Sequence, residues 1–470
     1  MHAVPVAPRL AALAEQLLGS PLPVRLRAWD GSESGPPEGP VIAVRHRRAL
    51  RRMLFRPGEL GLARAWVAGE LDVEGDLYAA LDGIAGLVWD RGQRPATAPD
   101  ASAPAVQERT VGSVARGRLA ALRELVRLAG PAVAVPPPPP PEEVRRRAGA
   151  VHSPGRDRQA ISHHYDVGND FYALVLGPSM VYSCAVWDPD AADASLEEAQ
   201  RAKLDLICRK LALREGQRLL DVGCGWGALV RHAARHYGVT AVGITLSAEQ
   251  AAHARRRLAE DGLADRVEIR VQDYRETDDG PYDAIASVGM AEHVGAARYQ
   301  EYADRLFGLL REGGRLLNHQ IARRPEPRER AYRIDPFIDA YVFPDGELAP
   351  VGRTVAQLEQ AGFEVRDMES LREHYALTLR QWVRNLEAGW PEAVRMTSPG
   401  RARVWRLYMA ASALAFERGR IGVNQILAVR TPTVTGRSGL PLRPRAWTEP
   451  VPTPSPSLED QGLDQAGTRD

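Results

Sequence analysis

Cysteine and lysine are both scarce in this chain of 470 residues. The three cysteines, Cys184, Cys208 and Cys224, have no paired spacing, which argues against a disulfide framework or a zinc site and indicates a reducing compartment. Only Lys203 and Lys210 are lysines among the 61 basic residues. A coding bias toward arginine explains this ratio more simply than a function does.

The chain also lacks an excess of charge of either sign and a long apolar run. Acidic and basic residues number 60 and 61, so the composition gives no reason to expect a nucleic acid as partner. No run of about 18 apolar residues occurs, and residues 1–5 lack a charged region followed by a hydrophobic stretch. We therefore expect a cytoplasmic protein that touches a membrane only from one side.

Proline-rich segments suggest the domain organisation. The chain exceeds the size at which one core keeps growing, so two domains are expected. Segments 94–104 and 136–141 are rich in proline, and helical spacing of leucine and valine lies between them at 114–129. The expected parts are a small amino-terminal α+β domain (1–90), a linker with one helix (91–150), a larger domain (151–430) and a disordered, proline-rich tail (431–470).

The most informative segment is 219–228, LLDVGCGWGA, in which a short apolar strand runs into Asp221 and then into Gly223, Gly225 and Gly227. Glycines permit a tight turn and close approach of a ligand, and the following helix offers unpaired N–H groups. The dinucleotide fingerprint would read G-x-G-x-x-G and be followed by a strand that ends in a carboxylate. Here the spacing is D-x-G-x-G-x-G and the next strand ends in GITLS, so S-adenosylmethionine is a better candidate than NAD.

Strands and helices alternate after this loop. Strands are expected over 240–244, 267–272 and 282–288, with a helix over 248–260. This alternation predicts an α/β fold, a doubly wound and mostly parallel sheet with helices on both faces. Asp221, Thr245 and Asp273 then fall at the carboxyl ends of strands, where such folds bind ligands.

Six further segments carry recognisable motifs: HYDVGNDFY (164–172), GPSMVYSCA (177–185), GITLS (243–247), QDY (272–274), EHVG (292–295) and YVFPDG (341–346). Together they resemble the cyclopropane fatty acyl phospholipid synthases and their mycolic-acid relatives. The similarity extends over roughly residues 150–430 and more weakly over 58–81, and several motifs in order are more specific than any one. The resemblance implies a seven-stranded sheet of the class I methyltransferase type. It also implies transfer of a methylene group from S-adenosylmethionine to the cis double bond of an unsaturated phospholipid acyl chain.

The chemistry of that reaction sets requirements for the site. An isolated alkene attacks only a very electrophilic methyl group, such as that of a sulfonium. The resulting carbocation needs a base for ring closure and a pocket that excludes water. Aromatic faces can stabilise such a cation by roughly 1–2 kcal/mol each. Candidates are Trp187, Tyr165, Phe171, Phe337 and Tyr341, although each alone is more simply explained as a core aromatic.

The resemblance implies that the base is a bicarbonate ion, held by the residues that match Cys184, Glu292, His319, Ile321 and Tyr375. Glu292 would accept the bicarbonate O–H, His319 and Tyr375 would donate, and Cys184 and Ile321 would supply backbone groups. Without the resemblance, His319 would be a strand-end histidine bonded to a neighbour. Glu292 could equally cap a helix that starts near Ala296.

The same resemblance assigns the cofactor site. The matching residues are Tyr182, Ser183, the loop from Gly223 to Gly227 with Asp221 before it, Thr245, Leu246, Gln250, Asp273 and Tyr274. One departure is Ser412, where many relatives have a cysteine. Because the mechanism needs no covalent intermediate on the enzyme, we interpret Ser412 as a packing residue.

The sequence is compatible with three functions. The first is cyclopropane synthesis on phospholipid acyl chains at the inner face of the membrane, where arginines such as those at 145–147 could touch phosphates. The second is methylation of the same alkene to a methylene- or methyl-branched chain. The third is a non-catalytic lipid-binding module, which loss of Glu292, His319 or Tyr375 would favour; none is lost. The small domain could present lipid, or only pack or form a homodimer.

Overall fold

The computed structural model describes residues 4–89, 111–144, 149–153, 155–157, 164–165, 167–188, 190, 194–326 and 334–442. The proline-rich segment 94–104, the arginines at 145–147 and the end of the expected tail, 443–470, lie outside these residues.

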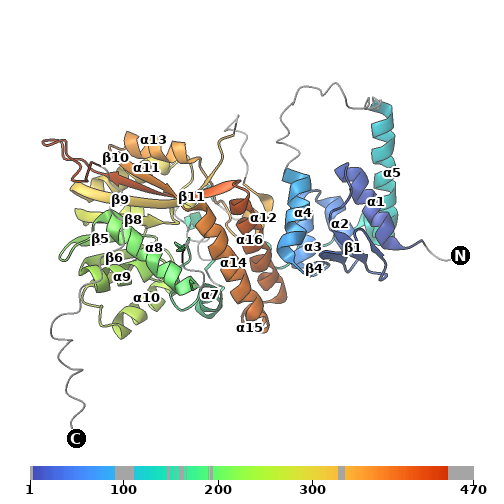
Figure 1. Ribbon diagram of the computed structural model, residues 1–470, viewed down its shortest axis with the longest axis horizontal. Coiled ribbons are helices and arrows are strands. Elements are labelled where there is room, and N and C mark those ends of the chain that lie inside the picture. Colours follow the sequence, from blue (N-terminus) through green and yellow to red (C-terminus); the bar gives the residue numbers. More distant parts are fainter. Residues whose placement is uncertain are drawn as a thin grey trace, which may run out of the picture.

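The amino-terminal part forms a small α+β domain around a four-stranded sheet in the order β2-β1-β3-β4 (Figure 1). Its elements are α1 (Val6–Leu18), β1 (Arg25–Ala28), β2 (Glu33–Ser34), β3 (Val41–Val44), α2 (Arg48–Phe55), α3 (Glu59–Val67), β4 (Leu71–Glu74) and α4 (Leu77–Trp89). Ala7, Leu10 and Ala11 of α1 are buried because their spacing places them on one helix face. This face packs against the sheet and forms the core of the domain.

The helix expected over 114–129 is α5 (Val111–Ala129). Its last residues, Leu128 and Ala129, belong to the core of the small domain. Arg9 of α1 also forms an ion pair with Glu124 at 2.6 Å. The helix therefore packs on the small domain, and the chain then continues through the proline-rich segment 136–141 toward the larger domain.

The larger domain contains the remaining elements in the order α7 (Asn169–Leu176), α8 (Leu196–Leu211), β5 (Arg218–Val222), α9 (Ala228–Tyr237), β6 (Thr240–Thr245), α10 (Ala248–Glu260), β7 (Val267–Val271), β8 (Tyr282–Val288), α11 (Tyr299–Leu309), β9 (Leu310–Arg323), α12 (Pro336–Tyr341), α13 (Val351–Gln360), β10 (Glu364–Ser370), α14 (Arg372–Ala388), α15 (Trp390–Met396), α16 (Pro399–Glu417) and β11 (Ile421–Val429). Its seven strands form one sheet in the order β10-β11-β9-β8-β5-β6-β7.

This sheet confirms the predicted fold class. Strands β9, β8, β5, β6 and β7 are parallel to one another, and only β11 pairs antiparallel, with β9 and β10. Helices α8, α9 and α10 pack on one face, and α11 and α13 cover the other (Figure 1). The register places Val288, the last residue of β8, beside His319 of β9. A residue in the middle of β9 therefore reaches the carboxyl end of β8, where ligands bind in such sheets.

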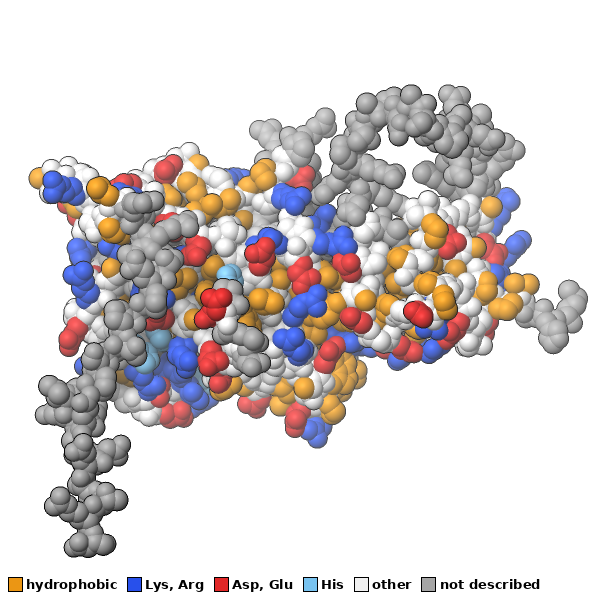
Figure 2. Space-filling view, in the orientation of Figure 1, with side chains coloured by type: hydrophobic (Ala, Val, Ile, Leu, Met, Phe, Trp, Pro, Cys, Tyr) orange, Lys and Arg blue, Asp and Glu red, His pale blue; other side chains and the backbone are white. Residues whose placement is uncertain are grey.

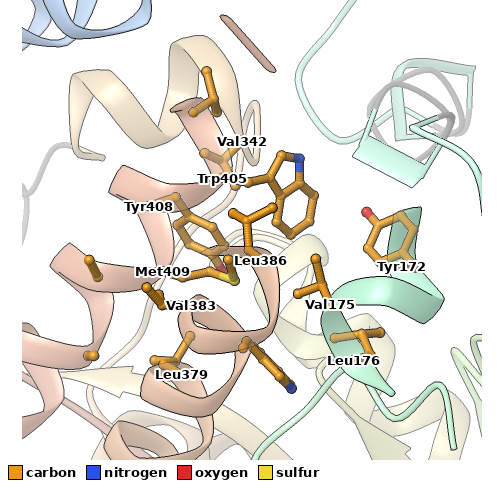
Figure 3. Packing of buried hydrophobic residues seen from close by; sticks show 14 of the residues in the cluster. Tyr172, Val175, Leu176, Val342, Leu379, Val383, Leu386, Trp405, Tyr408 and Met409 are labelled. Carbon is orange, nitrogen blue, oxygen red and sulfur yellow. The ribbon is translucent and has the colours of Figure 1, made fainter. Parts of the chain in front are cut away.

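A second apolar core lies beside the sheet, between α7, α14 and α16. Figure 3 shows Tyr172 and Val175 of α7, Leu379 and Leu386 of α14, and Trp405 of α16 converging in it. Trp66 and Val67 of α3 belong to the same buried cluster. The small domain and the larger domain thus share part of one hydrophobic core.

Part of the expected tail is ordered on the sheet. Thr433 Oγ1 donates to Glu312 at 3.2 Å, and Arg366 Nη1 donates to Ser438 Oγ at 2.9 Å. The expectation of disorder therefore does not hold for residues 431–442, because side chains of the sheet bind them.

Charged side chains of both signs are interspersed over the face of the molecule drawn in Figure 2, as the balanced composition suggests. Among the helices that the structure describes, none combines the length and apolar character needed to cross a membrane.

Candidate active site

The carboxyl ends of β6 and β7 enclose a cavity of about 70 Å³, called here the β6–β7 cavity. Its lining includes the predicted residues Gly223, Gly225, Thr245, Leu246, Gln250, Asp273 and Tyr274, together with Asp157, Gln272, Arg275, Met290 and His293. Thr245 Oγ1 donates to Gln250 Oε1 at 2.8 Å, so these two polar groups are fixed side by side. Arg275 forms an ion pair with Asp273 at 2.6 Å. The predicted cofactor residues of β6 and of the segments that follow β6 and β7 are therefore together at one edge of the sheet.

The three glycines of the loop have different surroundings, although all have positive φ. A Cβ built on Gly225 would meet nothing nearer than Gln250 Nε2 at 4.0 Å, so this glycine borders free space in the cavity. A Cβ on Gly227 would lie 3.0 Å from Ala254 Cβ of α10. Gly227 does not line the cavity, contrary to its prediction as a cofactor residue, because it faces a helix instead.

A second cavity, of about 90 Å³, lies between the end of β5 and helix α8 and is called the β5–α8 cavity. Tyr182, Ser183, Lys203 and Asp221 line it together with Gly223 and Gly225. Asp221 is 2% exposed, and its Oδ1 atom has no hydrogen-bond partner. Burial raises the pKa of Asp221 to about 7 although nearby Lys203 lowers it. Of these residues only Lys203 was not predicted to belong to the site.

A third cavity, the apolar cavity, encloses about 180 Å³. Most of its lining is hydrophobic or aromatic, including Ile338, Phe343, Leu379, Tyr408, Phe416 and Val423. Glu292, His319, Ile321 and Tyr375 also line it. Four of the five residues predicted to hold the base are thus brought to one apolar space from β9, from α14 and from the turn after β8.

Glu292 and His319 carry buried polar atoms that lack partners. Glu292 Oε1 accepts a hydrogen bond from the Ile321 N–H at 2.7 Å, whereas Oε2 has no partner. Both ring nitrogens of His319 are also without a partner, and the residue is 2% exposed. Burial raises the pKa of Glu292 to about 7 and lowers the pKa of His319 to about 3. His319 is therefore neutral at physiological pH and can donate one hydrogen bond.

These contacts contradict the structural alternatives for both residues. The N–H of Ala296 donates to Glu347 Oε2 at 2.9 Å, so Glu347 and not Glu292 serves as the cap there. The ring of His319 has no hydrogen-bonded neighbour. Unpartnered buried polar groups are costly and uncommon in native proteins, so such a group indicates a ligand or an ordered water.

The remaining predicted residues differ in their placement. Burial raises the pKa of Tyr375 well above its ordinary value, so its hydroxyl keeps its proton and can donate. The N–H of Ile321 is bonded to Glu292 and is not free for another acceptor. The side chain of Cys184 is fully buried, its Sγ donates to Ala185 O at 3.1 Å, and the residue does not line the apolar cavity.

Tyr165 and Gly289 line all three cavities. Gly289 follows β8 and has φ 68°, and its N–H donates to His319 O at 2.8 Å. A Cβ on Gly289 would meet no atom within 4 Å. This junction is the place where a ligand that fills the first two cavities could reach a second ligand in the apolar cavity.

The aromatic residues at the apolar cavity were mostly not those predicted. Of the five candidates, Tyr165 lines this cavity, whereas Trp187, Phe171, Phe337 and Tyr341 do not. Phe171, Phe337 and Tyr341 are instead buried in the apolar core. Tyr182 and Tyr375, predicted for other roles, also line it, and no local signal in the sequence indicated Phe343, Tyr408 and Phe416, which come from two segments far apart in the chain. Ser412 also lines the cavity, and its interpretation as a packing residue stays a prediction.

Comparison with known sequences settles the family. A family model described as "Mycolic acid cyclopropane synthetase" matches residues 152–426. The chain belongs to this family. It is 42% identical over 433 residues to a "Probable fatty acid methyltransferase" of Mycobacterium tuberculosis, covering 91% of this chain and 95% of the relative. It is 40% identical over 268 residues to the "Cyclopropane-fatty-acyl-phospholipid synthase" of Escherichia coli K12, covering 57% of this chain and 66% of that protein.

A solved structure agrees with the fold and the cofactor. The crystal structure of mycolic acid cyclopropane synthase CmaA1 complexed with SAH and CTAB matches with a TM-score of 0.54 and 35% identity, covering 58% of this chain and 98% of that chain. This member of the cyclopropane synthetase family is thus an S-adenosylmethionine-dependent methyltransferase. The free space beside Gly225 and the unpartnered oxygen of Asp221 fit such a cofactor.

Proposed function

We propose that the protein transfers a methylene group from S-adenosylmethionine to the cis double bond of an unsaturated phospholipid acyl chain, and that it closes a cyclopropane ring with bound bicarbonate as base. The observation that carries the proposal is the set of unpartnered atoms in the apolar cavity, Glu292 Oε2 and both ring nitrogens of His319. They offer one acceptor and one donor, and the Tyr375 hydroxyl offers a second donor. A small oxyanion that carries one proton is complementary to that set.

The residues of the chain have distinct tasks in this mechanism. When bound, S-adenosylmethionine supplies an electrophilic methyl group and bicarbonate supplies a base. Tyr165 and Gly289 form the opening through which cofactor and acyl chain meet. Ile338, Phe343 and Phe416 form apolar walls that exclude water from the developing cation. Glu292 would accept a hydrogen bond from the O–H of the oxyanion, while His319 and Tyr375 would donate hydrogen bonds to its other oxygens.

The substrate is proposed to come from a membrane surface. Phe55, the last residue of α2, and Leu62 of α3 have 41% and 42% of their surface exposed. Arg56, next to Phe55, is exposed as well. An apolar side chain beside a cation suits contact with the surface of an anionic bilayer.

A second candidate is methylation without ring closure. Two relatives that match more than 90% of the chain, from Mycobacterium tuberculosis and Pseudomonas putida, are each named "Probable fatty acid methyltransferase". The two reactions share the cofactor, the alkene and the cation, and they differ only in which proton leaves.

Lipid analysis distinguishes the candidates. The purified protein is incubated with S-adenosylmethionine and vesicles of a cis-monounsaturated anionic phospholipid, and the fatty acids are analysed by gas chromatography and mass spectrometry. Cyclopropane and methylene-branched products have equal mass but fragment differently. We expect the cyclopropane product, a rate that falls in bicarbonate-free buffer, and recovery when bicarbonate is added back.

Each other outcome of this assay has a defined meaning. A methylene-branched product would replace the first candidate by the second. A rate indifferent to bicarbonate would remove the ion from the mechanism. Tyr375→Phe is a matched variant because it deletes a single donor and keeps the ring, so it should need more bicarbonate for half-maximal rate.

A further inference from the structure

The two lysines of this arginine-rich chain are both buried. Lys203 is 2% exposed and Lys210 is fully buried, whereas the other basic residues are all arginines. A coding bias explains why exposed cations are arginines, but it does not explain why two buried positions keep lysine. The ammonium group is a compact point charge, whereas guanidinium is a wide planar fork, so a confined acceptor can select lysine.

Lys210 has structural partners that explain it. Its Nζ atom forms an ion pair with Glu369 of β10 and donates to Gln425 Oε1 of β11 at 2.8 Å. Lys210 therefore connects α8 to β10 and β11, the antiparallel edge of the sheet. Lys210 does not line the β5–α8 cavity.

Lys203 has a different environment. Its Nζ atom donates to Ser183 Oγ at 2.9 Å, and the side chain lines the β5–α8 cavity. Asp221 lines the same cavity from the end of β5, with Oδ1 unpartnered. Although both side chains are described, they make no ion pair with each other. A buried cation and a buried anion thus face one small cavity from two elements.

Two opposite charges held apart in a dry cavity are complementary to a zwitterion. The methionine part of S-adenosylmethionine ends in an α-ammonium and an α-carboxylate on one carbon atom. The β6–β7 cavity adjoins this space through Gly223, Gly225 and Gln250. An adenosine in the β6–β7 cavity would therefore direct its amino-acid end toward Lys203 and Asp221.

We propose that Lys203 binds the α-carboxylate of the cofactor and Asp221 its α-ammonium, so that the pair selects ligands that carry an intact amino acid. Ser183 accepts a hydrogen bond from Lys203 Nζ and so fixes the position of the lysine side chain. The proposal concerns cofactor binding and depends only on the S-adenosylmethionine dependence of the family, not on the lipid product. Burial lowers the pKa of Lys203 to about 8 and raises that of Asp221 to about 7, and a bound zwitterion would offset both shifts.

Calorimetric titration with three product-like ligands tests this pair. S-adenosylhomocysteine carries both charges, its decarboxylated analogue lacks the carboxylate, and 5′-methylthioadenosine lacks the amino acid. The wild-type protein should bind S-adenosylhomocysteine about 10- to 100-fold more tightly than the decarboxylated analogue, as expected for a charge-assisted hydrogen bond. Lys203→Met should abolish this preference and leave the affinity for 5′-methylthioadenosine unchanged.

Lys210→Met is the matched control, since it removes the other buried lysine of the same helix. We expect it to lower the unfolding temperature and to keep the preference for S-adenosylhomocysteine. Equal wild-type affinities for the carboxylated and decarboxylated ligands would overturn the proposal, and this comparison needs no variant to fold. A Lys203→Met protein that loses all three ligands equally would also overturn it, because the role of Lys203 would then be structural.

Discussion

Glu292 is restrained at one oxygen only. Oε1 is fixed by the Ile321 N–H, while Oε2 is buried in the apolar cavity without a partner. Desolvation disfavours the carboxylate, and it raises the pKa of Glu292 to about 7. The proposed task of this residue, to accept a hydrogen bond from the O–H of an oxyanion, requires the ionised form. Its protonation state therefore changes within the physiological range.

The turnover number should rise with pH through about 7. Below pH 7 Glu292 is mostly protonated and cannot accept the hydrogen bond from the oxyanion. Above pH 7 the carboxylate is present, so the raised pKa predicts that the rate falls as the pH is lowered. Glu292→Gln should lower the rate on the order of 10²–10⁴-fold and remove the rise. The checks are the pH dependence of the rate and, as control, calorimetry with S-adenosylhomocysteine, whose affinity should not change. A variant with wild-type turnover would exclude Glu292 from the mechanism.

The sequence predicted the types of the site residues better than their contacts. Glu292, His319 and Tyr375 were predicted from the resemblance and do share one cavity. The hydrogen bond from Ile321 to Glu292 could not be predicted, because it depends on how the turn after β8 meets β9. Lys203 looked like a minor exception to an arginine bias. Its environment became visible only when α8 was placed beside β5.

Among the elements of the fold, the glycine loop after β5 must both leave space for a ligand and pack closely against helix α10. Gly225 and Gly227 both have left-handed backbone, with φ of 54° and 79°. An alanine at either position costs roughly 1–2 kcal/mol for that conformation. The two positions differ in their surroundings. A Cβ on Gly225 would enter the free space of the cavity, whereas a Cβ on Gly227 would press against Ala254 of α10.

This difference predicts opposite phenotypes for two alanine variants. Gly225→Ala should lower the affinity for S-adenosylhomocysteine at least about tenfold, because the new methyl group occupies space that the ligand needs. Gly227→Ala should lower the free energy of unfolding further than Gly225→Ala, by about 1–3 kcal/mol, because it overpacks the contact with α10. Calorimetry and urea unfolding of both proteins give the comparison. Similar losses of affinity and of stability in the two variants would contradict the assignment.

Regular elements were predictable where their periodicity was strong. The helix expected over 248–260 and the strand over 282–288 are α10 and β8 with the same bounds. Hydrophobic alternation and a capping serine, Ser247, mark those ends locally. The tail was different. Residues 431–442 lack a core of their own but are held by side chains of the sheet, such as Arg366 and Glu312, that are distant in the sequence.

At the scale of the whole molecule, Arg403 of α16 connects the two domains. Its Nε atom donates to Trp66 O and its Nη2 atom to Leu71 O, both at 2.6 Å. It also forms an ion pair with Asp72 at 3.2 Å. Trp66 Nε1 donates in return to Arg403 O at 2.8 Å. These contacts join residues more than 300 positions apart, so no local pattern in the sequence could indicate them.

Replacing Arg403 by methionine should loosen the connection between the domains. The substitution removes a guanidinium whose Cζ lies 4.6 Å from the centroid of the Trp66 ring, and it takes one donor from each of Trp66 O, Leu71 O and Asp72. Trp66 O keeps the hydrogen bond from the Gly69 N–H at 2.9 Å, and Asp72 keeps its ion pair with Arg45 at 2.9 Å. The lost hydrogen bonds should therefore lower the free energy of unfolding by about 2–4 kcal/mol in total.

Arg395→Met provides the comparison for Arg403→Met, because it removes the same group from an ion pair with Glu392 on neighbouring α15. The Arg395 side chain is 72% exposed, so this change should cost less than about 0.5 kcal/mol. Urea unfolding followed by tryptophan fluorescence measures both variants. Trp66 lies in the core that α16 shares with the small domain, so its signal reports on this interface. Equal stability of the two variants would mean that apolar burial alone joins the domains. A large loss confined to Arg403→Met would show that a specific polar contact, as well as the shared core, holds the small domain on the larger domain.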